Sequence, residues 1–457
     1  MDKYSSIEND NPYLLSKSTI KDPPQSLRGT FQYLGPGFIL SAGIVGSGEL
    51  IATTTLGAKA GFVTFWVILV SCFVKVALQL EFGKHAINSG ESTMASLNKL
   101  PGPKLGKVNW SICTWLFLMI FKVLQVGGII GGVALTLNLA FDQISVSYWT
   151  WIVAFSVSLL IFRGYYQFVE KFSLTMIGLF TIFTFISLAY LQYTPYALSW
   201  FNIVEGLQFK LPPETVVFAI AAFGITGVGG DEIMYYNYWC LEKGYAAYTG
   251  PREENEEWIK RAKGWIKVMY IDALLAMIIY TLVTAAFYLL GAAVLHAQSE
   301  IPQGYAMVET LSMMYTETLG SNAKSVYLLG AFIVLYSTLF AGLAAWTRVF
   351  ADTFGQIGLI NFYDPTTRKR TIAILAWVFP VIWSLLFLFI KLPVLMVLIG
   401  GVSTSIILLV VVFAAFHFRY WRLHEKLRPN KFYDTAFWLS ASVIILIGVY
   451  GIFKILF

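Results

Sequence analysis

The chain has 457 residues, of which 57% are hydrophobic and 13% are charged, and its formal net charge is +6. A typical soluble domain has about 25% charged residues, so this composition excludes an ordinary soluble protein. No basic stripe interleaves with aromatic residues, which argues against a nucleic-acid partner.

The first 34 residues are polar and contain Pro23 and Pro24. We interpret residues 1–34 as a mostly disordered cytoplasmic tail.

Continuous apolar segments of roughly 20 residues follow, and this length and continuity predict transmembrane helices rather than strands of a barrel. We therefore predict an all-α, multi-pass membrane protein with about eleven spans. The segments lie near residues 35–58, 61–83, 110–140, 148–162, 172–192, 212–240, 266–292, 326–347, 371–390, 393–416 and 435–456.

The basic residues fall mostly in alternate loops between these segments. If the N-terminus is inside, the outer side keeps only Lys59, Lys210, Lys324, Lys391 and Lys454. Cytoplasmic loops of membrane proteins carry an excess of lysine and arginine. The pattern predicts a protein of the cell membrane with a cytoplasmic N-terminus and an extracellular or periplasmic C-terminus.

Two apolar segments are interrupted by glycines, and in both cases carboxylates follow at once. The first contains Gly46, Ser47 and Gly48 and then Glu49. The second contains Gly227, Val228, Gly229 and Gly230, followed by Asp231 and Glu232.

These interruptions lie about half a chain apart. A pair of glycine-interrupted segments in corresponding positions of two halves is the best sequence pointer to the binding site of a transporter. We predict two inverted repeats of five helices each, over residues 35–193 and 212–417, and an eleventh helix over 435–456. The binding site is expected between broken helices 1 and 6.

The three carboxylates suggest the chemistry of the site. Carboxylate oxygens suit hard cations such as Mg²⁺, Ca²⁺ or Mn²⁺. We predict Glu49 and Asp231 as metal ligands, with Glu232 as a weaker candidate. Two structural readings stay open: Glu49 can instead bind exposed amides and lock the break, and Asp231 can cap the helix that follows.

Other polar residues lie in or beside the apolar segments. Lys122 and Gln125 are three residues apart, hence on one helix face, and Lys122 would neutralise a carboxylate of the empty site or pair structurally. Thr226 joins them as a candidate for coupling or support of the site. Lys75 and Glu81 are expected at the cytoplasmic interface.

The stretch GPGFILSAGIVGSGELIATTTLGAKAGF, from Gly35 to Phe62, resembles the first helix of the Nramp family of divalent-metal transporters. The similarity continues through Leu78, Gln79 and Gly90. The resemblance implies the leucine-transporter-type fold. The site departs from the family pattern: Gly46-Ser47-Gly48-Glu49 stands where the family has Asp-Pro-Gly-Asn, and residues 228–230 stand where it has Met-Pro-His.

We therefore expect a divergent Nramp-related secondary transporter that moves a cation, in particular a divalent metal ion of the Mg²⁺ or Mn²⁺ class, by alternating access. H⁺ is the expected coupling ion, and no cofactor is expected. The alternative is a gradient-coupled transporter of an amino acid or another small organic solute, because half-helix N-termini suit a substrate carboxylate. No catalytic constellation is evident, so an enzyme is not expected.

Overall fold

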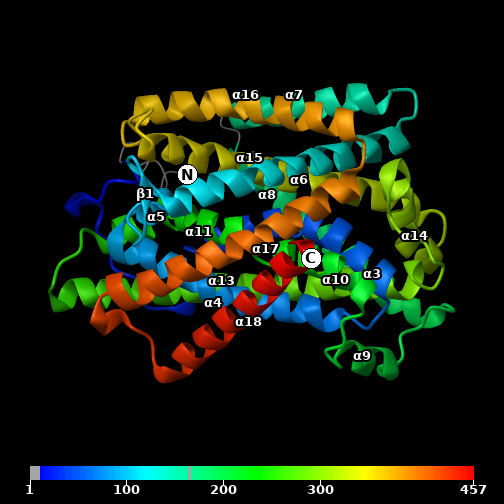
Figure 1. Cartoon of the computed structure of the whole chain (residues 1–457), viewed down its shortest axis with the longest axis horizontal. Coiled ribbons are helices and arrows are strands. Elements are labelled where there is room, and N and C mark those ends of the chain that lie inside the picture. Colours follow the sequence, from blue (N-terminus) through cyan, green and yellow to red (C-terminus); the bar gives the residue numbers. More distant parts are fainter. Residues whose placement is uncertain (1–10, 163–165, 457) are drawn as a thin grey trace.

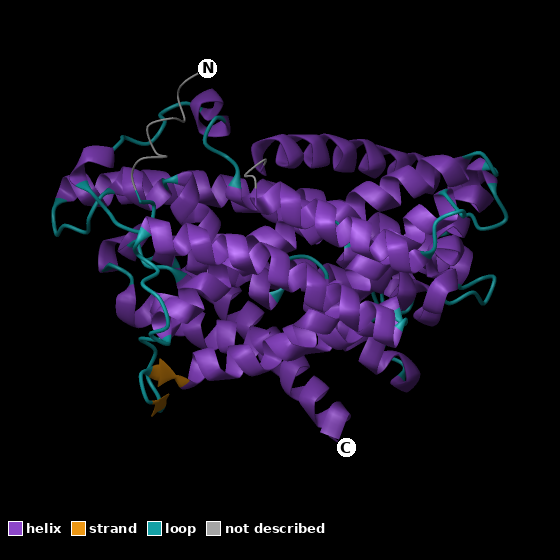
Figure 2. Cartoon of the chain, turned by 90° about the horizontal axis from the view of Figure 1, so that it is seen from above, coloured by secondary structure: helices purple, strands orange, loops and turns teal. Residues whose placement is uncertain are grey.

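The computed structural model describes residues 11–162 and 166–456, and these are almost entirely helical (Figure 2). The helices run roughly along the longest axis of the molecule, and loops gather at its two ends (Figures 1 and 2). Two short strands, β1 (Lys104–Leu105) and β2 (Val108–Asn109), pair antiparallel. The α-helices are α1 (Leu27–Phe31), α2 (Pro36–Ile44), α3 (Thr54–Ala60), α4 (Phe65–Ser89), α5 (Thr93–Leu97), α6 (Trp110–Ala140), α7 (Val146–Phe162), α8 (Tyr166–Tyr190), α9 (Trp200–Gly206), α10 (Val216–Ile225), α11 (Gly230–Lys243), α12 (Tyr245–Thr249), α13 (Glu256–Leu290), α14 (Met307–Leu319), α15 (Ala323–Gln356), α16 (Pro365–Ile390), α17 (Pro393–His417) and α18 (Lys431–Leu456).

Within the described ranges, eight helices are long and apolar enough to cross a membrane, and two shorter apolar helices accompany them. Helix 1 is not among these because its pieces, α2 and α3, are short. The all-α membrane class is confirmed, whereas the number of eleven spans stays a prediction.

The two broken helices lie in the middle of the bundle. α17 packs against α6 and α10, and α13 packs against α4 and α2 (Figure 1). α16 and α7 lie together at one edge of the view, and α4 and α18 lie at the opposite edge (Figure 1). The packing of long helices around α10 and α11 buries their polar ends away from lipid, which unwound backbone at membrane depth requires.

The N-terminal segment differs from the expectation. Of the expected tail, residues 1–10 lie outside the described ranges, but residues 11–34 are packed onto the helices. Tyr13 is 5% exposed and donates a hydrogen bond to Glu242 Oε1 at 2.7 Å. Trp265 Nε1 donates to the carbonyl of Lys21 at 3.0 Å. Burial of an aromatic ring and backbone pairing fix this segment, so disorder was the wrong expectation for residues 11–34.

Candidate functional site

Helix 1 is interrupted where the sequence predicted. α2 ends at Ile44, Val45 has a non-helical ψ of 74°, and a π-helical stretch, Gly48–Thr53, connects to α3. A Cβ on Gly48 would lie 2.8 Å from the carbonyl oxygen of Ile225, at the end of α10. Glycine at this position therefore lets the break in helix 1 lie directly against the break in helix 6.

Helix 6 is interrupted between α10 and α11. Thr226 is extended, with ψ of 136°, and Gly227 has φ of +65°. Glycine adopts this left-handed conformation at little cost. The chain resumes as α11 at Gly230, so this predicted break is confirmed as well.

Glu49 connects the two breaks. Its Oε2 accepts a hydrogen bond from the amide of Gly46 at 3.4 Å, and its Oε1 accepts one from the amide of Gly227 at 3.3 Å. Thr284 of α13 donates to the same Oε1 at 3.1 Å. The side chain is fully buried. Both carboxylate oxygens therefore satisfy amides that the interrupted helices leave open.

Asp231 and Glu232 occupy the first turn of α11. Glu232 Oε2 accepts a hydrogen bond from the amide of Gly229, so Glu232, and not Asp231, binds back to the start of this helix. Asp231 Oδ2 accepts a hydrogen bond from Tyr235 at 3.0 Å and lies 3.2 Å from Lys122 Nζ. Asp231 Oδ1 is buried and has no hydrogen-bond partner among the described residues.

These two acids line a small cavity of about 60 Å³ between the broken helices and their neighbours. Helix α6 contributes Lys122 and Gln125, and α2 contributes Leu40 and Gly43. The other lining residues are apolar, small or aromatic: Ile39, Val126, Ile129, Tyr235, Trp239, Thr338, Ala341, Gly342, Ala345 and Trp346. A mostly apolar cavity with a few convergent polar groups is typical of a small-molecule or ion site.

Lys122 is the cation of this cavity. Its Nζ donates to Gln125 Oε1 at 2.6 Å and to Thr404 Oγ1 of α17 at 2.8 Å, and the third neighbour is Asp231. The ammonium therefore joins α6, α11 and α17 through three oxygen atoms. The side chain is buried, so the positive charge remains inside the cavity wall.

The predicted site residues fall into two neighbouring groups. Asp231, Glu232, Lys122 and Gln125 meet at the cavity, whereas Glu49 is not among its lining residues. Among the residues that the structure describes, no group of three or more His, Cys, Asp or Glu side chains is arranged to hold a metal ion. The remaining predicted residues surround the breaks: Gly46, Ser47, Gly48, Thr226, Gly227, Val228, Gly229 and Gly230.

Several contacts carry no signal in the sequence. Thr284 binds Glu49 and Trp346 lines the cavity, but threonine and tryptophan in apolar helices are ordinary packing residues.

Lys75 and Glu81, expected at the interface, are fully buried inside the bundle, so that expectation was wrong. Lys75 binds backbone carbonyls, and Glu81 pairs with Arg419 Nη1 at 3.0 Å.

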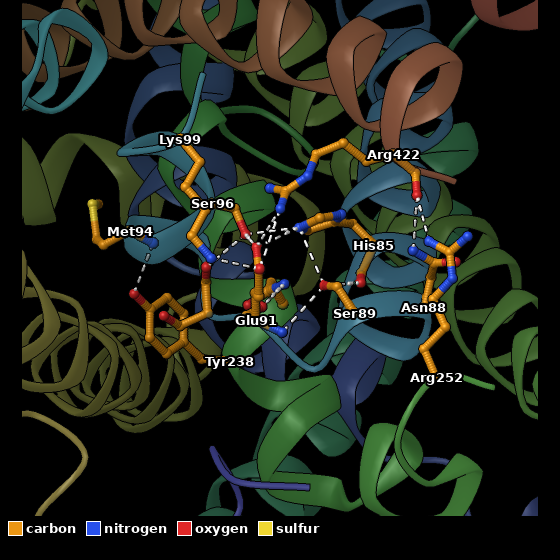
Figure 3. Close-up of polar contacts among 12 residues, drawn as sticks. His85, Asn88, Ser89, Glu91, Met94, Ser96, Lys99, Tyr238, Arg252 and Arg422 are labelled. Atoms are coloured by element: carbon orange, nitrogen blue, oxygen red, sulfur yellow. Dashed lines mark hydrogen bonds and ion pairs between the residues drawn. The ribbon is translucent and has the colours of Figure 1, made fainter. Parts of the chain in front are cut away.

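A second group of charges lies near one end of the bundle, after α4. Glu91 accepts a hydrogen bond from Lys99 Nζ at 2.7 Å and lies 2.9 Å from Arg422 Nη2, with Ser96 also converging on it (Figure 3). Burial alone would raise the pKa of Glu91, but the contacts with His85 and Lys99 and the charge of Arg422 outweigh it and hold the pKa well below 4.5. We call Glu91, Ser96, Lys99, His85 and Arg422 the Glu91 cluster.

A helical membrane protein in which two interrupted helices meet beside a cavity with a few convergent charges has the architecture of a secondary transporter. The comparisons with known proteins give the family. The chain belongs to the Nramp family: the model described as "Natural resistance-associated macrophage protein-like" matches residues 37–454. The expected resemblance is thereby confirmed, and so is the expectation of a transporter rather than an enzyme.

Characterised relatives match at low identity over most of their length. The divalent metal cation transporter MntH of Agrobacterium fabrum is 23% identical over 73% of this chain and 72% of its own length. MntH of Yersinia enterocolitica is 24% identical over 79% of this chain and 81% of its own length.

Solved structures with the same fold include a variant of the Eremococcus coleocola manganese transporter, with a TM-score of 0.68 and 14% identity over 96% of this chain and 90% of that chain. MhsT in complex with L-phenylalanine matches with a TM-score of 0.57 and 14% identity over 94% of this chain and 99% of that chain. The leucine-transporter-type fold expected from the sequence is thereby confirmed.

Proposed function

We propose that this protein is a secondary transporter that moves a divalent metal cation of the Mg²⁺ or Mn²⁺ class by alternating access. The observation that carries the proposal is the pair Asp231 and Glu232, which the interruption of helix 6 places at the start of α11, beside one cavity. The family and the metal-transporting relatives support a cation as substrate.

Asp231 is the principal ligand in this proposal. Its Oδ1 is buried without a hydrogen-bond partner among the described residues, and such an oxygen is costly unless something binds it. A hard cation supplies that partner. Glu232 provides the second carboxylate, and water and backbone carbonyls complete the oxygen shell.

Lys122 is the resident counter-ion of the empty site. Its ammonium sits 3.2 Å from Asp231 Oδ2, on the same carboxylate whose other oxygen would bind the metal ion. Two positive charges this close repel each other strongly at low dielectric, so Lys122 must move or lose its proton when the metal enters. Such exchange of a proton for a metal ion would couple transport to a proton gradient.

Glu49 acts as a lock in this proposal and not as a direct ligand. Its hydrogen bond from Gly46 lies within the break of helix 1, its hydrogen bond from Gly227 joins that break to the break of helix 6, and Thr284 ties both to α13. Glu49 also lies outside the cavity lining. Alternating access requires these breaks to stay in register while the surrounding helices move. The orientation with the N-terminus in the cytoplasm, and the repeats 35–193 and 212–417, remain part of the proposal.

The decisive experiment is uptake into liposomes that contain the purified chain. We expect Mn²⁺ uptake above that of empty liposomes, competition by an excess of Mg²⁺, and stimulation by an inward proton gradient. Absence of uptake of Mn²⁺, Mg²⁺ and Ca²⁺ by protein that is monodisperse and cooperatively folded would refute metal transport.

A second candidate is an organic zwitterion such as an amino acid. Lys122 and Asp231 offer opposite charges in one cavity, and Tyr235, Trp239 and Trp346 provide aromatic walls. A zwitterion would pair with both charges without displacing the lysine. Calorimetry separates the candidates, because an amino-acid panel gives heat in this case and a metal panel gives none.

A further inference from the structure

A second buried lysine, Lys75, lies beside the break in helix 6 and is not used by the proposed metal site. It belongs to α4 and is 0% exposed. Its Nζ donates hydrogen bonds to the backbone carbonyls of Phe223, Gly224 (3.1 Å) and Thr226 (2.9 Å). Because α10 ends at Ile225, the lysine lies at the carbonyl end of this half-helix.

The contacts define the charge of Lys75. Three carbonyl oxygens lie within hydrogen-bond distance of one nitrogen, and three N–H groups are needed to give each of them its own donor. A neutral amine has two N–H groups, whereas an ammonium has three. All of the described hydrogen-bond acceptors of Lys75 are carbonyl oxygens, so a full positive charge is held by backbone dipoles.

The surroundings of the ammonium are rich in oxygen. Ser71, one turn earlier on α4, donates to the carbonyls of Phe223 (2.9 Å) and Thr226 (2.8 Å). The hydroxyls of Thr226 and Thr53 lie 3.0 Å apart beside them. The C-terminal end of a helix carries partial negative charge, and unwound carbonyls of broken helices coordinate cations in transporters.

We propose that the carbonyls of Phe223, Gly224 and Thr226, with the hydroxyl of Ser71, form a site for a monovalent alkali cation such as Na⁺, and that the ammonium of Lys75 permanently occupies it as a tethered cation. The end of α10 therefore keeps its compensating charge without a soluble ion. No Na⁺ binds at this position during the transport cycle of the natural chain.

The proposal predicts that removing the lysine opens the site. In Lys75→Ala the ammonium and its hydrocarbon stem are both absent, which leaves space and unpaired carbonyls. The melting temperature of the purified variant in choline chloride should fall well below that of the natural chain, and NaCl at equal ionic strength should raise it. A ligand that binds only the folded state stabilises it in proportion to the logarithm of its concentration.

Three controls make the test specific. The melting temperature of the natural chain should be the same in NaCl, KCl and choline chloride. Lys267→Ala removes an exposed lysine of α13 and should behave like the natural chain in every salt. Lys75→Met removes the charge but keeps an apolar stem in the space, so it should be destabilised without being rescued by Na⁺.

Saturable binding of radioactive sodium by Lys75→Ala, and its absence in the natural chain, would give the same answer independently of stability. Equal melting temperatures of Lys75→Ala in Na⁺ and choline would overturn the proposal. Lys75→Gln, which retains two N–H donors but no charge, replaces the alanine variant if that variant does not accumulate. Failure of both variants to fold even in NaCl also overturns it, because Na⁺ would then not replace the ammonium.

Discussion

The Glu91 cluster and the cavity at the helix breaks both bring a carboxylate together with basic side chains, but they differ in how completely that carboxylate is paired. In the Glu91 cluster the carboxylate forms ion pairs with a lysine and an arginine and accepts a hydrogen bond from a serine hydroxyl. In the cavity Asp231 has one oxygen without a partner among the described residues. A carboxylate whose two oxygens both have partners rigidifies a structure, whereas a buried carboxylate oxygen without a partner is costly unless a ligand completes it. The difference supports the proposal that the cavity, and not the Glu91 cluster, binds the substrate.

The largest expected effect comes from removing the cavity carboxylates. Asp231→Asn and Glu232→Gln should each lower Mn²⁺ affinity by at least about tenfold, since even groups that only support metal ligands contribute this much. Uptake into liposomes at several Mn²⁺ concentrations measures the effect. Glu309→Gln, which alters an exposed carboxylate of α14, is the matched control and should transport normally. Normal uptake by both cavity variants would show that the metal ion binds elsewhere in the protein.

The next effect concerns the counter-ion. Lys122→Met leaves Asp231 without its 3.2 Å partner, and an uncompensated buried charge costs about 3–5 kcal/mol. We expect a lower melting temperature without metal and a larger rise on addition of Mn²⁺ than in the natural chain. Thermal unfolding with and without Mn²⁺ measures both. A variant that Mn²⁺ stabilises less than the natural chain would show that Lys122 assists binding.

Glu49→Gln tests whether Glu49 holds the two helix breaks together or binds the metal ion directly. Glutamine has one acceptor oxygen where Glu49 has two, so it can accept the hydrogen bond from the amide of Gly46 or from that of Gly227, but not from both. An unsatisfied buried donor costs about 1–3 kcal/mol. We expect reduced stability in denaturant or thermal unfolding, with Mn²⁺ affinity changed less than in Asp231→Asn. A loss of affinity as large as that of Asp231→Asn, at unchanged stability, would identify Glu49 as a metal ligand.

The smallest effect is expected in the Glu91 cluster. The pKa of Glu91 is held below its ordinary value, so its pairing contributes stability that is fully present above about pH 4.5 and is lost as the pH falls through the lowered pKa. Glu91→Gln should therefore reduce stability at neutral pH and flatten its decline in acid, with transport unchanged. Thermal unfolding between pH 3 and 7 tests this, and an unchanged acid profile would contradict it.

The sequence by itself determined the membrane class and the positions of both helix breaks. Recurring apolar segments of about 20 residues are typical of membrane spans. The glycines directly before Glu49 and before Asp231 and Glu232 mark the two breaks. The residues on either side of the first break, from Gly35 to Phe62, were also sufficient to indicate the family. These features are local, so they can be read from neighbouring residues.

Only the tertiary structure decided what each charge does. Lys122 binds Thr404, which is 282 residues away, and Glu49 binds Gly227, which is 178 residues away. Helix periodicity gives the face on which a side chain lies, but the partner on that face depends on how distant helices pack. For this reason Glu49, Asp231 and Glu232 look equivalent in the sequence, although one holds backbone amides and two face the cavity. Packing likewise placed Lys75 at the end of α10 instead of at the membrane surface.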